Sequence, residues 1–236
     1  MTGGITGLLF GDLTNLRRDP MLVAATLAPL LVAVVLRVGS LPAVERLAGT
    51  VDIVPWLPVI LGFFLLLTPF LVGFVVGFLL LEEREDRILE VVAVTPRGYA
   101  GFLAYRLGLP AVAGGVGAVV VAVISGLSNL EVPRLLGAAV LCAGSATLVT
   151  MTMAAMARDR VQGLAVVKVT GFALLGAVAF QLLPNPWRWA LAPLPQTWVI
   201  EAVAGAGPTW PPLLIGTLTH AAAGWLLWRR IRRRVV

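Results

Sequence analysis

The sequence predicts an all-α membrane protein with six transmembrane helices. Of its 236 residues, 59% are hydrophobic and only 13% are charged, and the mean hydropathy is +0.95. Roughly a quarter of the residues in a soluble domain are charged, so this composition is typical of a membrane protein. Each crossing needs about 20 apolar residues, which leaves room for six spans with short connections. No stretch is long and polar enough for a separate soluble domain, so residues 1–236 are expected to form a single transmembrane domain.

The chain opens with a weakly amphipathic stretch, residues 3–18. Its leucines alternate with polar residues at helical spacing, and Arg17 and Arg18 lie at its end. Such a helix can lie in the membrane interface before the chain turns into the bilayer. We expect an interfacial helix here, followed by a turn at Asp19-Pro20.

Six long apolar runs follow the interfacial stretch. The second run contains Gly73 and Gly77, and this spacing lets two helix backbones approach closely, so it is a candidate dimer face. The fourth run is rich in small and hydroxylated residues, which favours tight helix packing over a pathway lining. The expected spans are 21–38, 56–81, 100–125, 134–157, 163–183 and 213–228.

Residues 82–99 form a charged segment between the second and third spans. The segment holds five of the twelve carboxylates of the chain, and such a cluster cannot lie in hydrocarbon. At helical spacing, an apolar side around Ile88 and Val91 opposes an acidic side that includes Glu82, Glu83 and Glu85. We expect a helix in water at the membrane surface that docks a soluble partner; a plain solvated loop is the alternative.

The connection before the last span is rich in proline and tryptophan. Prolines break helices and tryptophans favour the headgroup level, so residues 184–212 are expected to form a re-entrant or interfacial excursion. A short helix at 197–204, carrying Glu201, is expected within it.

The basic residues set the expected orientation. Fourteen of the eighteen Lys and Arg residues fall in segments on the side of the two termini, and four fall on the other side. Cytoplasmic loops carry the excess of basic residues. Both termini and segment 82–99 are therefore expected in the cytoplasm, and residues 184–211 outside.

The sequence shows few groups for chemistry. It has no phosphate-cradling G-x-x-x-x-G-K-[ST] pattern and no His, Cys and carboxylate grouping at metal-ligand spacing. His220 is expected to be a satisfied histidine and Cys142 a small core residue. Arg106 and Lys168 are expected to snorkel to the membrane surface, which leaves the spans nearly free of buried charge. The energy for any uphill transport is then expected from another chain.

This layout resembles the permease subunit of type-2 ABC exporters. In that family, an acidic helix after the second span is followed by an apolar run, Thr-Pro and a basic residue in the next span. The matching residues here are Arg17-Arg18-Asp19-Pro20, Glu82-Glu83-Arg84-Glu85, Ile88-Leu89-Glu90, Thr95-Pro96, Arg106 and Pro195-Gln196; Asp86-Arg87 stand where the family often has Gly-Thr. Within the family, the compact form resembles bacterial fluoroquinolone-export permeases.

The resemblance implies a function. Two permease chains, identical or homologous, would form the pathway in the bacterial cytoplasmic membrane, and two cytoplasmic ABC ATPase subunits would drive export of a drug-like or amphipathic substrate. ATP and Mg²⁺ would bind the ATPase, so this chain would be no enzyme, hold no cofactor or metal, contact membrane lipids and bind no nucleic acid. The implied docking residues are Glu82, Glu83, Arg84, Glu85, Arg87, Glu90, Pro96 and Arg97, assisted by Arg17 and Arg18.

Two other classes of protein fit parts of the pattern. A membrane scaffold or assembly protein would use the acidic segment to recruit another basic partner. An ion-coupled carrier is disfavoured by the scarcity of charge within the spans. An adjacent gene for a nucleotide-binding subunit would separate the exporter from both.

Overall fold

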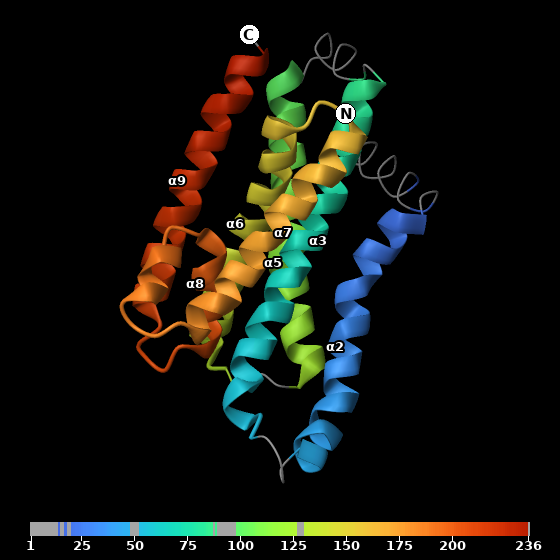
Figure 1. Ribbon diagram of the computed structural model, residues 1–236. Coiled ribbons are helices and arrows are strands. Elements are labelled where there is room, and N and C mark those ends of the chain that lie inside the picture. Colours follow the sequence, from blue (N-terminus) through green and yellow to red (C-terminus); the bar gives the residue numbers. More distant parts are fainter. Residues whose placement is uncertain are drawn as a thin grey trace.

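All regular structure in the described part of the chain is helical. The computed structural model describes residues 14, 17, 20–47, 52–86, 88, 98–126 and 130–235. The long helices run side by side as a bundle, and the short helix α8 lies at one end of it (Figure 1). The elements are α2 (Pro20–Leu47), η1 (Val54–Trp56), α3 (Leu57–Glu85), α5 (Gly98–Ser125), α6 (Val132–Met156), α7 (Arg160–Leu182), η2 (Trp187–Leu191), α8 (Pro195–Ala204) and α9 (Trp210–Val235). The predicted all-α fold is confirmed.

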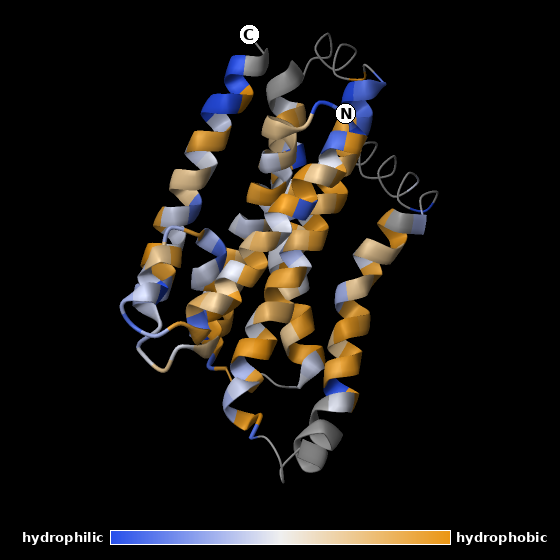
Figure 2. Ribbon diagram, in the orientation of Figure 1, coloured by the Kyte–Doolittle hydropathy of each residue, from blue (hydrophilic) through white to orange (hydrophobic). Residues whose placement is uncertain are grey.

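Within the described residues, five helices are long and apolar enough to cross a membrane. The qualifying segments are Leu22–Gly39, Val54–Glu85, Gly101–Ser125, Val132–Met156 and Arg160–Leu182, and they coincide with the first five expected spans. The sixth expected span lies within α9, which does not reach the same hydropathy. Prolines, glycines, threonines and His220 interrupt its apolar residues, and arginines end it. Figure 2 shows this difference as paler colour along α9.

Helix α6 lies at the centre of the bundle. It contacts α3, α5, α7, α8 and α9, and small residues such as Gly137, Ala138 and Ala146 are buried along it. Small side chains let neighbouring helix axes come close, which is how membrane helices gain packing energy without a hydrophobic driving force. The tight packing predicted for this helix from its composition is therefore present.

The Gly73 and Gly77 pair joins α3 to α6 within the chain. A Cβ atom at Gly73 would lie 2.7 Å from the Cβ of Val149, and one at Gly77 would lie 2.6 Å from the Sδ of Met153. Thr150 of α6 also donates a hydrogen bond to the carbonyl of Gly73 at 3.0 Å. Both glycines are buried, so the interpretation of the motif as a dimer face is wrong.

A proline inside α3 explains the position of Cys142. Pro69 has no N–H, so the carbonyl of Leu65, four residues earlier, lacks its usual helical donor. The Sγ of Cys142 in α6 lies 3.8 Å from that carbonyl oxygen and donates to it. Cys142 is fully buried, as expected for a small core residue.

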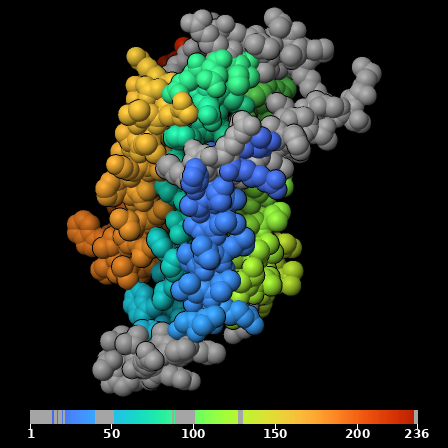
Figure 3. All heavy atoms as spheres, turned by 90° about the vertical axis from the view of Figure 1, so that its right-hand side faces the viewer, coloured from blue at the N-terminus to red at the C-terminus, as the bar shows by residue number. Residues whose placement is uncertain are grey.

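Helix α2 covers the face of the bundle where α3 and α5 meet (Figure 3). Its inner side chains, Leu22 and Ala33, are buried, while Leu31, Val35 and Val38 are more than half exposed. An apolar outer face of this kind is the surface that a lipid-embedded helix presents to hydrocarbon.

The two ends of the bundle differ in character. One end gathers the last turn of α3, the α6–α7 turn, the start of α5 and the arginine-rich end of α9 (Figure 2). There, Ile231 packs in one cluster with Leu80 and Phe102. The opposite end holds η1, η2 and α8 (Figure 1). The described connections group as the sequence predicts, with the charged end of α3 and the C-terminal arginines on one side.

The short helix expected at 197–204 is present as α8 (Pro195–Ala204) and is inserted into the end of the bundle. Its residues Trp198, Val199 and Ile200 are buried against α3, α6, α7 and α9. The carboxylate of Glu201 accepts hydrogen bonds from Gln181 at 2.9 Å and from Arg188 at 3.0 Å. These contacts fasten α8 to α7 and to the connection between them.

Candidate functional site

The charged segment begins as the last turn of α3. The expected span ended at residue 81, but the helix continues to Glu85, so Glu82, Glu83, Arg84 and Glu85 project from α3 itself. The N–H of Asp86 donates to the carbonyl of Glu82 at 2.9 Å and closes this turn. The first four predicted docking residues are thus held on a rigid helix that continues into the bundle.

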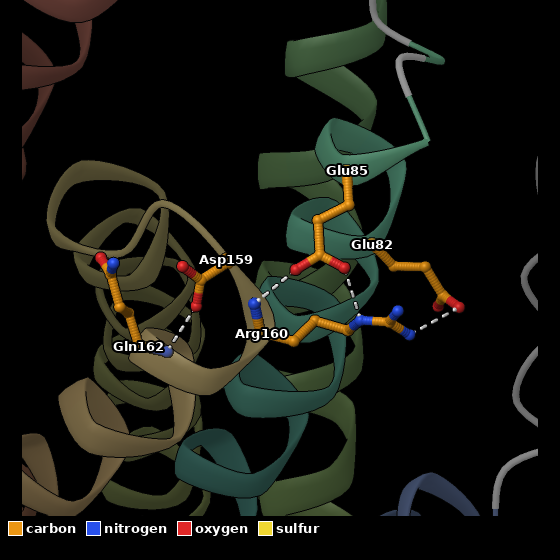
Figure 4. A network of polar contacts seen from close by, with 5 residues as sticks. All are labelled: Glu82, Glu85, Asp159, Arg160 and Gln162. Atoms are coloured by element: carbon orange, nitrogen blue, oxygen red, sulfur yellow. Dashed lines mark hydrogen bonds and ion pairs between the residues drawn. The ribbon is translucent and has the colours of Figure 1, made fainter.

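Glu82 and Glu85 hold the first residue of α7, as Figure 4 shows. The Nε of Arg160 lies 2.8 Å from Oε2 of Glu85, and its backbone N–H donates to Oε1 of Glu85 at 2.7 Å. A second guanidinium nitrogen of Arg160 lies 3.3 Å from Glu82. Because the first N–H groups of a helix lack partners within it and carry partial positive charge, Glu85 satisfies both the side chain and the helix end.

Asp159 and Gln162 fix the point at which α7 begins. The carboxylate of Asp159 accepts from the N–H of Gln162 at 2.8 Å (Figure 4). The amide oxygen of Gln162 in turn accepts from the N–H of Arg158 at 3.1 Å. This reciprocal arrangement is related to a capping box and satisfies two backbone donors at the turn. Arg160 is thereby placed beside the last turn of α3.

Glu83 forms a buried ion pair with Arg106 of α5. The Nε of Arg106 lies 2.9 Å from Oε2 of Glu83, and a second N–H contacts the other carboxylate oxygen. The side chains are 1% and 12% exposed, and the guanidinium also lies 5.5 Å from the ring centres of Phe102 and Tyr105.

Two expectations about this pair are wrong. Glu83 does not lie in water, since it is buried against Arg106. Arg106 does not snorkel to the surface, since its guanidinium is enclosed and has Glu83 and two rings around it. Lys168, by contrast, is exposed on α7. The buried charge is retained because the two groups neutralise each other and exchange two hydrogen bonds.

Arg84 links the same turn of α3 to the end of α6. Its guanidinium donates to the carbonyl of Ala157 at 3.2 Å, next to the last residue of α6. Carbonyls at a helix C-terminus lack intrahelical donors, so an arginine there is favourable. The last turn of α3 is therefore tied to α5 by Glu83, to α6 by Arg84 and to α7 by Glu82 and Glu85.

Only some of the remaining predicted docking residues and their neighbours belong to the described part of the chain. Arg17 is exposed, as are Asp86 and Ile88 just after α3. The predicted residues that lie outside the described ones are Arg18, Arg87, Glu90, Pro96 and Arg97. Sequence reasoning missed Arg160, whose only signal was a basic residue in a very short turn, and misread Arg106, whose signal was a lone charge in an apolar run.

His220 is a further buried polar group inside the bundle. Its Nε2 lies 2.8 Å from the hydroxyl oxygen of Ser145, and its Nδ1 lies 2.7 Å from the carbonyl of Gly216. A neutral ring that donates from Nδ1 and accepts at Nε2 satisfies both contacts, in agreement with the expected satisfied histidine. Within the described residues no cluster of His, Cys, Asp and Glu is able to hold a metal ion.

Comparison with known proteins identifies the family. The profile of the family described as "Fluoroquinolones export permease protein Rv2686c-like" matches residues 12–228. The chain belongs to this family. The fluoroquinolones export permease proteins MT2760 and Rv2686c, from the Mycobacterium tuberculosis strains CDC 1551/Oshkosh and ATCC 25618/H37Rv, are each 30% identical over 234 residues, covering 94% of this chain and 92% of the relative. No solved structure matches.

Membership of the Rv2686c-like family confirms the resemblance drawn from segment 82–99 and the layout of the spans. The relatives are named as permeases, and the five long apolar helices make this chain a multi-pass membrane protein. Family membership therefore favours a transport role over the role of a membrane scaffold.

Proposed function

We propose that the chain is the membrane-spanning subunit of an ATP-driven exporter in the bacterial cytoplasmic membrane. Two permease chains form the pathway, and a separate ABC ATPase docks on the cytoplasmic side through segment 82–99. The observation that carries this proposal is the last turn of α3, whose charged residues together bind three neighbouring helices, α5, α6 and α7. Family membership supports it independently.

The ties of α3 provide a route for mechanical coupling. A partner that displaces the chain just after Glu85 pulls on Arg160 at the start of α7 and on Arg106 in α5. Packed helices transmit such a displacement because their interiors are close-packed rather than fluid. A closing motion of two ATPase subunits would thus reach α3, α5, α6 and α7 together.

The partner-facing surface begins with the exposed groups after α3. Asp86 and Ile88 are exposed, the isoleucine by 39%, and they combine a charge with an apolar contact. Glu82, Arg84 and Glu85 form the base of this surface, and Arg87, Glu90, Pro96 and Arg97 continue it in sequence. Glu83 is assigned to the interior instead. Arg17 and Arg18 assist from the interfacial helix.

Helix α9 is proposed as the sixth span, which places both termini in the cytoplasm. Its 26 residues give a length of about 39 Å at 1.5 Å per residue, enough for a hydrocarbon core of about 30 Å. Trp210 lies at one end, and Trp225 and Trp228 precede the terminal arginines at the other. Tryptophans at both interfaces and arginines on the cytoplasmic side are typical of a spanning helix.

The substrate is proposed to be a drug-like amphipathic molecule, with fluoroquinolones as the first candidates, because two relatives carry that name. ATP and Mg²⁺ are assigned to the ATPase, since this sequence has no phosphate-cradling loop. The chain itself supplies the pathway and the docking surface.

A charge reversal at Asp86 tests the docking site. Asp86→Lys should reduce co-purification of the ATPase at least tenfold, because like charges at a partner's rim oppose association. Glu131→Lys is the matched control, since Glu131 is an exposed acid just before α6, at the opposite end of the bundle, and its side chain makes no cap hydrogen bond. Equal co-purification of both variants with the ATPase would contradict docking at this end.

A further inference from the structure

A shallow groove of about 350 Å³ lies between α5, α6 and α9. It is lined almost wholly by apolar atoms, including those of Ala111 on α5, Ala143 and Met151 on α6, and Ala221 and Gly224 on α9. Helix α9 packs on α6 and α8, so the groove follows the side of α9 that faces α5. Its volume lies at the lower end of the range of about 300–1,000 Å³ found for ligand pockets, so the chemistry of its lining, rather than its size, indicates the occupant.

Two of the three polar residues that line the groove, Thr147 and His220, are already paired, and the third, Thr217, is exposed. The hydroxyl of Thr147 donates to backbone carbonyls, with Leu107 and Ala143 both at 3.2 Å. Both ring nitrogens of His220 have partners, as described above. Apart from the hydroxyl of Thr217, the side chains of the groove offer a ligand's hydrogen-bonding groups no free partner, whereas an alkyl chain needs none.

Basic and aromatic residues stand above the groove on α9. The guanidinium of Arg229 lies 4.2 Å from the ring centre of Trp225, and that of Arg232 lies 5.3 Å from the ring centre of Trp228. Ile231 is buried, and the flanking arginines are exposed. Residues 210–235 contain no acidic residue, so this end of α9 presents positive charge alone.

The spacing along α9 matches a phospholipid. Gly224 lies eight residues before Arg232, about 12 Å along the helix, and Thr217 lies about 22 Å away at 1.5 Å per residue. Half of a hydrocarbon core is about 15 Å thick. An acyl chain that hangs from a headgroup at the level of Trp228 therefore reaches the groove and extends along it.

We propose that this groove binds one anionic phospholipid, with an acyl chain between α5, α6 and α9 and its phosphate at Arg229 and Arg232. The inference rests on the proposed placement of α9 as the sixth span. The arginine–tryptophan pairs provide charge and a flat apolar surface at headgroup level, and the groove provides the chain site. The charge selects an anionic over a zwitterionic headgroup.

Matched substitutions test the chain site. Ala221→Leu fills the groove with a side chain, whereas Ala222→Leu places the same side chain on an exposed neighbouring position that does not line the groove. The purified protein would first be placed in nanodiscs of phosphatidylglycerol and phosphatidylcholine. It would then be released from the nanodiscs, and the lipids that stay bound to it would be counted by native mass spectrometry. We expect one retained phosphatidylglycerol per wild-type chain, preferred at least tenfold, with retention lost in Ala221→Leu and kept in Ala222→Leu.

A second pair of variants tests the headgroup site at constant net charge. Arg229→Gln with Arg232→Gln should abolish the preference for phosphatidylglycerol, while Arg230→Gln with Arg233→Gln should keep it. Equal retention by both pairs, or by both leucine variants, would overturn the lipid site. Retention of phosphatidylcholine as well as phosphatidylglycerol by wild-type protein would overturn the anionic preference.

The lipid site and the proposed function fail in different ways. All four variants should still co-purify with the ATPase, because none of the substituted residues is among those proposed to dock it. If the wild-type protein binds the ATPase normally but shows no lipid selectivity, the lipid site alone is refuted. Normal lipid selectivity without any ATPase binding would refute the docking proposal alone.

Discussion

The guanidinium of Arg106 in α5 lies against the carboxylate of Glu83 in α3, with side chains 1% and 12% exposed. Removing two charges from water is expensive, and their mutual attraction only offsets that cost when the geometry is good. The pair is thus better explained as a fixed link between two helices than as a source of stability. Glu83 is adjacent in sequence to Arg84, which binds the end of α6, and to Glu82, which binds α7.

The first prediction concerns this link. Arg106→Met or Glu83→Leu alone should destabilise the protein by about 3–5 kcal/mol, because each leaves an uncompensated buried charge. The double variant should be destabilised less than either single one. Unfolding in detergent, followed by intrinsic tryptophan fluorescence, measures both effects. Additive losses in the double variant would show that the two side chains do not act as a pair.

The second prediction concerns the tie between α3 and α7. Glu82→Lys with Glu85→Lys should change stability little, since partly exposed pairs contribute about 0–1 kcal/mol. It should nevertheless lower ATP-dependent export strongly, because three positive groups then repel one another where α3 met α7. Adding Arg160→Glu restores attraction and should recover at least half of the export. Export at the wild-type level in the double variant would remove any coupling role from Glu82 and Glu85.

The third prediction compares two glycines of α3. Gly73→Ala should cost more stability than Gly77→Ala, because the new methyl group meets α6 backbone and the stiff side chain of Val149 at position 73. At position 77 it meets chiefly the flexible thioether of Met153. Overpacking costs typically about 1–3 kcal/mol. Thermal unfolding of the two variants in the same detergent measures the difference in stability. A less stable Gly77→Ala variant would contradict the packing of α3 on α6.

The positions of the helices were predictable because membrane crossing imposes a length. A run of apolar residues long enough for hydrocarbon has to be helical to satisfy its backbone, so the expected spans 56–81 and 134–157 differ from α3 and α6 by a few residues only. The same rule explains why the end of α3 was misplaced. Hydropathy stops at residue 81, whereas the helix stops where its backbone bonds end, at Glu85.

The partners of the charged residues were not predictable from the sequence. Glu83 and Arg106 are 23 positions apart, and Arg160 lies 75 positions after Glu85. Periodicity shows which residues share a face of one helix, but the rotation of one helix against another depends on packing of the whole bundle. The contact of Glu83 with Arg106 of a neighbouring helix was therefore not predictable.

The fourth prediction is the topology. Single cysteines at Ser40, Thr95 and Thr209, in a Cys142→Ala background, should be labelled from outside intact cells at positions 40 and 209 only. The reason is the excess of basic residues on the side of the termini. Membrane-permeant reagent serves as the control that each cysteine is reactive. External labelling at position 95 would reverse the assigned orientation.

The most direct measurement is transport by the assembled complex. Inside-out vesicles that contain this chain with its ATPase should accumulate a fluoroquinolone when ATP is added, and a protonophore should not prevent it. Vesicles with either chain alone, or without ATP, should accumulate none, because the pathway and the energy source lie on different subunits. Accumulation by this chain alone under a proton gradient would contradict the account and identify an ion-coupled carrier instead.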